Sequence, residues 1–187
     1  MSKKIFSVIL SIFLVALTVF SFLTTYTNNR SGTVSAATCN VSAEDKEYIV
    51  NKYGDCKTAE ELILRLNDEI CNEYTYYRPL IIFQSFDFDN FIKTKKGLCF
   101  DYSCYLKIVF NIVFPEIKVH VCDVRINFFN YHSYNFVETD THRYFVDLTS
   151  DQTRYKEKKK RIIYEDIGTL SYYEYTNQYN EKILNYH

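Results

Sequence analysis

Cys99 is the residue of this sequence whose type and position most directly suggest chemistry. It follows two lysines and Gly97 in the stretch KKGLCFDYSCYLKIVF, residues 95–110, where apolar residues recur at helical spacing. A helix N-terminus presents unpaired N–H groups and the positive end of the helix dipole, and both favour the reactive thiolate form of cysteine. The position therefore predicts a nucleophile, with a buried structural thiol or a disulfide-bonded cysteine as the alternatives.

A thiolate nucleophile needs an imidazole beside it and a third group that orients the imidazole. His132 and Asp147 lie in two segments with strand-like alternation, YHSYNFVE and HRYFVDL, on either side of a polar turn. If Thr139 and Asp140 form a two-residue turn, so that Glu138 faces Thr141, then His132 lies directly opposite Asp147, with Cβ atoms ~4.5–5.5 Å apart. A slip of one residue would put the two side chains on opposite faces, so this prediction depends on the turn.

The remaining candidates for a site have weaker support. Gln84 is a candidate side-chain donor to an oxyanion, as are the N–H groups at the start of the helix. In the same register His142 points to the other face of the hairpin, and we expect His142 and His120 to lie at the surface. Asp101 and Tyr102 lie close to Cys99, but their presence is explained by the charge preferred in the first turn of a helix and by core packing, respectively. No C-x-x-C or C-x-x-H spacing occurs, so a zinc site has little support.

Helices in the first half of the chain must position these residues. Ser42 and Asp45 predict the start of a helix that ends at Gly54, and Thr58 with Glu61 predicts a capping box at the start of the next helix. Apolar residues then recur at helical spacing, at Leu62, Leu66, Ile70 and Tyr74.

The centre and second half of the chain predict one more helix and then strands. The helical pattern that starts at Leu98 runs to just before Pro115. Residues 117–122 alternate as a strand, and residues 162–166 (IIYED) could add another. The segment LIIFQSFDF, residues 80–88, fits a short strand or an extended segment equally well. Helices followed by an antiparallel sheet indicate an α+β fold.

Residues 1–37 are predicted to lie outside this fold. A basic start precedes the apolar run 5–23, and small residues follow in TVSAAT, which is the pattern of a secretory signal. We expect cleavage after Ala36 or Ala37, with an uncleaved membrane anchor as the alternative. In both cases residues 38–187 are expected outside the cytoplasm, secreted or at the cell surface.

Composition narrows the possible partners. The 187 residues suit one domain, 47% of them are hydrophobic, and the formal net charge is −1, so no nucleic-acid partner is expected. Six cysteines in an exported chain predict disulfides, although a free nucleophile would leave an odd number. The basic stretch RYKEKKKR, residues 154–161, is either a solvated loop or strand edge, or a contact for an anionic surface.

The blocks KGLCFDYSCYL, YHSYNFVE and RYFVDLTSD, in this order, resemble the transglutaminase-like superfamily of cysteine enzymes. Members have a G-x-C start to a central helix, an H-x-aromatic strand and a strand that ends in V-D-x-T. The match covers about residues 58–150. The resemblance implies a papain-like α+β core in residues 38–187, with N-terminal helices and the nucleophile helix packed on an antiparallel sheet. It also implies that Cys99 is the nucleophile, His132 the acid/base and Asp147 the group that orients the imidazole.

The same resemblance implies an activity without a cofactor or a metal. Members act on peptide or carboxamide bonds through an acyl-thioester, as peptidases, amidases or protein-glutamine acyltransferases, and the small size here speaks against a calcium requirement. A peptide or protein substrate is expected, with a cell-wall peptide or surface protein suggested by location alone. Membrane contact is expected only through residues 5–23, if they stay uncleaved.

Two departures from the family pattern keep other functions open. Tyr134 stands where the family often has tryptophan, and the chain contains no tryptophan at all. The first alternative is therefore a catalytically inactive transglutaminase-like binding module. The second is a disulfide-stapled exported protein without a site.

Overall fold

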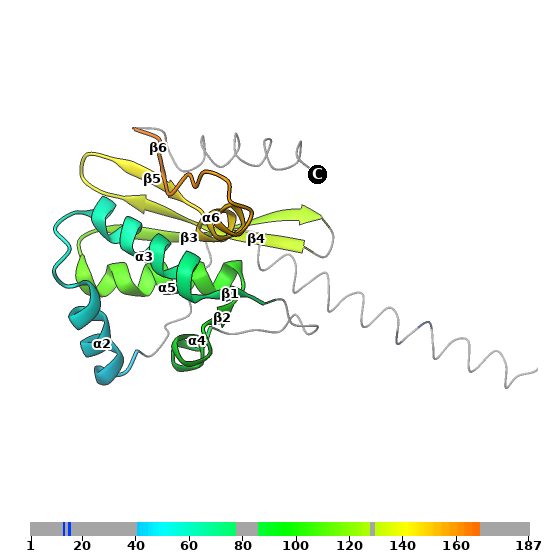
Figure 1. The fold of residues 1–187 in the computed structure, drawn as a ribbon, viewed down its shortest axis with the longest axis horizontal. Helices are drawn as coiled ribbons and strands as arrows, with labels where there is room; N and C mark the ends of the chain where they lie inside the picture. The colour runs from blue at the N-terminus through cyan, green and yellow to red at the C-terminus, as the bar shows by residue number, and fades with distance from the viewer. Residues whose placement is uncertain (1–12, 14, 16–40, 78–85, 128–129, 169–187) are drawn as a thin grey trace, which may run out of the picture. The chain divides into compact units, whose positions relative to one another are not determined.

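The computed structural model describes part of the chain, namely residues 13, 15, 41–77, 86–127 and 130–168 (Figure 1). The chain divides into two units, residues 1–32 and 33–187. Of the first unit only Phe13 and Val15 are described, so the predicted signal peptide lies almost wholly outside the described residues. Among the residues that are described, no helix has both the length and the apolar character needed to cross a membrane.

The two predicted N-terminal helices are confirmed. Helix α2 (Ala43–Tyr53) is capped by Ser42, whose hydroxyl accepts the Asp45 N–H at 3.0 Å. The Asp45 carboxylate in turn accepts the Ser42 N–H at 3.1 Å. Helix α3 (Ala59–Glu73) is capped by Thr58, which accepts the Glu61 N–H at 3.2 Å. The Glu61 carboxylate accepts the N–H of Lys57 rather than that of Thr58, so the predicted capping box is only half formed.

Helix α5 (Cys99–Val113) confirms the predicted central helix, which ends at Phe114, immediately before Pro115. Three short elements precede it: β1 (Thr75–Tyr76), α4 (Phe88–Thr94) and β2 (Lys96–Gly97), with β1 and β2 paired in parallel. Helix α4 was not predicted. Its seven residues are too few for a helical period to stand out, and its start depends on the Asp87 carboxylate, which accepts the Asn90 N–H at 3.0 Å.

The second half of the chain forms an antiparallel sheet. Its strands lie in the order β3 (Lys118–Asn127), β4 (Asn130–Glu138), β5 (Arg143–Val146) and β6 (Glu165–Asp166). Helix α5 packs against β3 and β4, and α3 packs against α5 and against α6 (Leu148–Lys156). All of these helices except α6, which lies between β5 and β6 in the chain, precede the sheet, and α5 covers one of its faces, which confirms the predicted α+β class (Figure 1).

The predicted two-residue turn between β4 and β5 is wrong. Glu138 pairs with Arg143 instead of Thr141, so the turn contains four residues. Thr139 closes it, because its hydroxyl accepts the His142 N–H and its N–H donates to the His142 carbonyl, each at 2.9 Å. The pairing is displaced by two residues from the predicted one. A displacement of two preserves the alternation of side chains, so residues predicted on one face remain on that face.

The segment after β5 also differs from the prediction. The strand-like pattern HRYFVDL runs to residue 148, but β5 ends at Val146, and Asp147 caps helix α6 by accepting the Ser150 N–H at 3.0 Å. The basic stretch 154–161 therefore begins in the last turn of α6, and its remainder is a loop. The predicted strand at 162–166 is confirmed only as the two residues of β6.

Apolar residues fill both faces of the sheet. On the face under α5, the main core contains Ile49, Leu62, Leu66, Ile70, Leu106, Val109, Val137 and Val146. On the other face, a smaller buried cluster contains Cys122, Val124, Tyr134, Phe136, Phe145 and Ile167. This double coverage explains why β4 is buried at every position from Ser133 to Val137.

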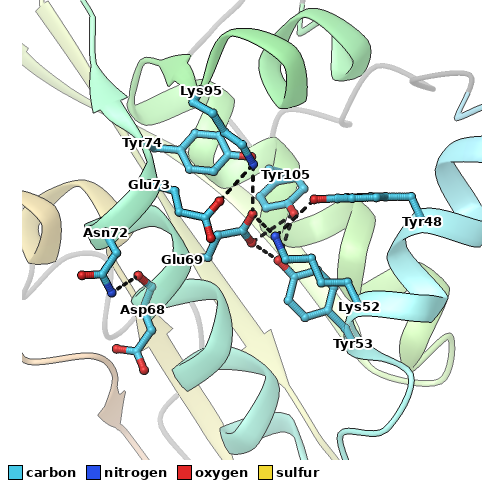
Figure 2. A network of polar contacts seen from close by, with 10 residues as sticks. All are labelled: Tyr48, Lys52, Tyr53, Asp68, Glu69, Asn72, Glu73, Tyr74, Lys95 and Tyr105. Atoms are coloured by element: carbon cyan, nitrogen blue, oxygen red, sulfur yellow. Dashed lines mark hydrogen bonds and ion pairs between the residues drawn. The ribbon is translucent and has the colours of Figure 1, made fainter.

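A buried glutamate connects the helices around α5 (Figure 2). The side chain of Glu69, on α3, is 4% exposed and forms ion pairs with Lys52 of α2 at 2.5 Å and with Lys95 at 3.5 Å. It also accepts hydrogen bonds from the hydroxyls of Tyr53 and Tyr105. One carboxylate therefore holds together α2, α3, α5 and the end of α4, where Lys95 is the C-cap.

Candidate active site

Cys99 is the first residue of α5, and Leu98 is its N-cap. Leu98 cannot cap through its side chain, and Asp101 instead accepts the Leu98 N–H at 2.8 Å. Burial raises the pKa of Asp101, while this hydrogen bond lowers it. The side chain of Cys99 is thus held at the end of α5 that carries unpaired N–H groups, and the residue is 8% exposed.

The short strand β2, which leads into α5, is hydrogen-bonded to the β1 segment and packs against α4. Thr75 donates to the Lys95 carbonyl at 2.8 Å, and Tyr77 donates to the Gly97 carbonyl at 3.0 Å. Gly97 packs so closely that a Cβ atom there would lie 2.6 Å from the ring of Phe91. Because of this contact, only glycine lets the chain pass at this distance from α4 before it turns into α5.

His132 and Asp147 are in direct contact. The Nε2 atom of His132 lies 2.7 Å from Oδ2 of Asp147, and the side chains are 16% and 7% exposed. Asn135 pairs with Val146, so the observed register puts Asp147 opposite Tyr134 and diagonal to His132, not directly opposite as predicted. The two residues meet because the two-residue displacement keeps them on one face, and because both side chains can span the diagonal.

Asp147 has a second structural role that the sequence did not reveal. Its Oδ1 atom accepts the Ser150 N–H at 3.0 Å and so caps α6, while Oδ2 faces His132. Because Oδ1 is fixed by this hydrogen bond, the Asp147 side chain has few rotamers available, and the position of Oδ2 is restricted as well. The start of α6 therefore fixes the orientation of the group that contacts the imidazole.

His132 lies between Asp147 and Cys99 and carries a perturbed pKa. Burial lowers the pKa of His132, but the charge and hydrogen bond of Asp147, followed by the hydrogen bond and charge of Cys99, raise it well above 6.5. Nε2 faces Asp147, so Nδ1 is the ring nitrogen that this carboxylate does not engage. The three predicted residues therefore lie in one contiguous chain, with the imidazole in the middle.

The pKa of His132 gives a prediction that separates the charge of the Asp147 side chain from its shape. The variant Asp147→Asn keeps an oxygen that can cap α6 but removes the carboxylate charge. We expect the pKa of His132 to fall toward its ordinary value, because that charge and its hydrogen bond are the largest influences that raise it. NMR titration of the His132 Cε1–H resonance, assigned by its loss in His132→Gln, measures this directly.

Stability should follow the same titration. A histidine whose pKa is raised on folding contributes stability that is fully present below its unfolded pKa of ~6.5 and is lost as pH rises through the folded value. The difference in unfolding free energy between the natural protein and Asp147→Asn should therefore be largest below about pH 6.5 and shrink at higher pH. A difference that does not change with pH would show that the two groups do not interact as charges.

The other two histidines that the structure describes are arranged as expected of surface residues. The side chain of His142 is 51% exposed and pairs with Asp166 at 3.0 Å. That of His120 is 38% exposed, and burial lowers its pKa, although Glu138 at 4.0 Å raises it. Gln84, the predicted oxyanion donor, lies outside the described residues.

Sequence reasoning missed a cavity beside the start of α5. It has a volume of about 350 Å³ and is lined from α5 by Asp101, from β2 by Lys96 and Gly97, and from α4 by Asp87 and Phe91. Three of these residues lie within four positions of Cys99. The signal was weak, since the cavity depends on the unpredicted helix α4.

The expected disulfides are not found among the described cysteines. No disulfide joins the five described cysteines, which are all buried: Cys56, Cys71, Cys99, Cys104 and Cys122. Cys39 lies outside the described residues. Cys99 and Cys104 are five residues apart on α5, which is poor geometry for a cystine. Within the described ranges, no group of three or more His, Cys, Asp or Glu side chains could hold a metal ion.

Comparison with known proteins finds a distant structural similarity to a solved structure. A solved structure described as a TGase is similar with a TM-score of 0.44 and 16% sequence identity. The likeness covers 70% of this chain and 37% of that chain, so this chain spans little more than a third of that protein's length. No protein-family model and no curated protein matches the sequence.

Proposed function

We propose that this protein is an exported, transglutaminase-like cysteine enzyme that cleaves a peptide or carboxamide bond through an acyl-thioester. The observation that carries the proposal is the chain of contacts from Asp147 through His132 to Cys99, at the first turn of α5. A strongly perturbed histidine between a carboxylate and a thiol at a helix start is the arrangement that thiol catalysis requires.

The proposed reaction gives each of the three groups a role: Cys99 is the nucleophile, His132 transfers protons and Asp147 orients the imidazole. The Cys99 sulfur, whose proton has passed to the His132 imidazole, attacks the carbonyl carbon, and a sulfur electron pair forms the new C–S bond while the carbonyl π electrons move onto oxygen. In this proposal, N–H groups at the start of α5 stabilise that oxyanion, with Gln84 as the predicted side-chain donor. The His132 imidazolium then donates a proton to the leaving amine, and the C–N bond breaks to leave the thioester.

The second half of the reaction returns the enzyme to its starting state. Water, the nucleophile we propose, gives up a proton to His132 as its oxygen attacks the thioester carbonyl, and the sulfur leaves as the thiolate. An amine in place of water would make the protein an acyltransferase with the same residues. Asp147 holds the ring orientation through both halves and stabilises its protonated form.

The cavity beside α5 offers a place for the substrate chain. Its lining residues include Phe91, Asp87, Asp101 and Lys96, so the cavity wall combines an aromatic residue with residues of both charges. A peptide that lies there would pass along β2, directly before Cys99. A cell-wall peptide or a surface protein is the substrate class we propose, on the basis of the predicted export.

Trapping of the thioester tests this function. The protein is incubated with a mixture of glutamine-containing and cell-wall-derived peptides, quenched in acid and digested for mass spectrometry. We expect an acyl adduct on Cys99, and a peptide hydroxamate when hydroxylamine is present to take the acyl group. No adduct from any peptide, combined with a Cys99 that resists alkylation at neutral pH, would support the inactive binding module instead.

A further inference from the structure

We propose that the basic loop, defined as residues 154–161, is a docking surface for the anionic face of a lipid bilayer. The loop begins in the last turn of α6, a helix that starts next to Asp147 and is ~14 Å long at 1.5 Å per residue. The site and the loop therefore lie at opposite ends of one helix. The proposal concerns where the protein is held, and it stands whether or not Cys99 is catalytic.

Charge is concentrated in this loop. It contains six basic residues and one acidic residue, a formal charge of +5, in a chain whose net charge is −1. The remainder of the chain is therefore net acidic, with a formal charge of −6. Such segregation produces a local positive field on a protein that lacks a global one.

Most of the lysines in the loop are not neutralised by the described part of the protein. Arg161 pairs with Asp68 at 2.6 Å, and Lys159 pairs with Glu157 at 2.7 Å. Lys156, Lys158 and Lys160 are exposed and form no ion pair with any described residue. Their ammonium groups are thus available to an external anion.

The backbone of the loop is held in place, so these ammonium groups are presented together. Lys158 adopts a left-handed conformation with φ of 56°, and Lys159 donates to the Arg154 carbonyl at 2.8 Å. At the end of the loop, the buried carboxylate of Asp151 accepts the N–H groups of Ile162 and Ile163 at 2.8 and 2.6 Å. A loop with this many bonds loses little further entropy when it docks.

Exposed apolar side chains favour a bilayer over a soluble polyanion. Ile162, directly after the loop, is 54% exposed, and Tyr155 within it is 44% exposed. The Tyr155 hydroxyl is held by Asn72 at 2.6 Å, which leaves the ring at the surface. Lysines beside exposed aliphatic and aromatic groups are typical of segments that lie in the interface of a membrane with anionic lipids.

A single tryptophan can report docking of this loop in the full chain. The sequence has no tryptophan, so in the variant Ile162→Trp all tryptophan emission comes from that position, whatever residues 5–23 do. With vesicles of equal parts phosphatidylglycerol and phosphatidylcholine at low salt, we expect a blue shift and quenching by brominated lipid. Vesicles of phosphatidylcholine alone, or high salt, should abolish both changes.

Matched charge variants test the role of the lysines. In the Ile162→Trp background, K156Q/K158Q/K160Q should need about a hundredfold more lipid, because each basic residue near such a surface contributes ~1 kcal/mol and 1.4 kcal/mol is tenfold. The control K46Q/K93Q/K118Q removes the same charge from exposed lysines on α2, α4 and β3, and should bind nearly as the parent does.

Several outcomes would overturn the proposal. Equal shifts with neutral and anionic vesicles, or equal weakening in the two triple variants, would show that the lysines do not direct docking. An equal shift in Val50→Trp, at a 51% exposed position on α2, would show general adsorption. Salt-sensitive binding to soluble polyphosphate, without any vesicle-induced shift at position 162, would identify a polyanion site in place of a membrane site.

Discussion

Cys99→Ala is expected to abolish turnover of any substrate identified by thioester trapping. Loss of the nucleophile from a triad costs on the order of 10⁶-fold in kcat, because no other group can form the covalent intermediate. The fold should survive, since the change removes one sulfur atom at the first residue of α5. Initial rates by mass spectrometry, with circular dichroism on the same samples, measure both.

Cys104→Ala is the matched control. Cys104 is also buried and also on α5, five residues further along, and it has no place in the proposed reaction. We expect this variant to keep its activity with at most a modest loss of stability. If both variants lose activity alike, the cause is a disturbed helix and not a missing nucleophile.

His132→Gln provides a second and independent outcome. It should lose nearly as much activity as Cys99→Ala, and the double variant should be no worse than either single variant, because the two groups act as one unit. Multiplicative losses would mean that Cys99 and His132 act separately, which the contact between them contradicts. Retained activity in Cys99→Ala would overturn the assignment of the nucleophile.

Glu69→Ala is expected to destabilise the protein by ~3–5 kcal/mol, the cost of breaking a buried ion pair by removal of one partner. The change leaves Lys52 and Lys95 without their shared carboxylate and takes the acceptor from the hydroxyls of Tyr53 and Tyr105 (Figure 2). Tyr53 and Tyr105 are 1% and 0% exposed, so solvent replaces the hydrogen bonds of their hydroxyls poorly. Urea unfolding followed by circular dichroism measures the difference.

Glu73→Ala is the control for Glu69→Ala. Glu73 lies on the same helix and pairs with the same Lys95, at 3.3 Å, but its side chain is 49% exposed. An exposed pair contributes ~0–1 kcal/mol, so this variant should unfold nearly as the parent does. Comparable losses in the two variants would mean that burial of Glu69 is not what makes its ion pairs matter.

The sequence alone determined the elements whose signals are local. The caps at Ser42 and Thr58 and the apolar spacing from Leu98 onward predicted α2, α3 and α5, because a helix forms contacts within a few residues. The helix start at Cys99 followed from the same pattern. The identity of the three candidate site residues also came from the sequence, and their catalytic roles stay predictions.

Tertiary structure decided everything that depends on distant residues. The four-residue turn at Thr139–His142 set the register, and Asp147 and His132 still meet because a two-residue displacement preserves the face. The start of α6 at Asp147, and the assembly of Lys52 and Lys95 around Glu69, join segments far apart in the chain. No short-range pattern encodes such pairings, since they form only when helices and strands pack against one another.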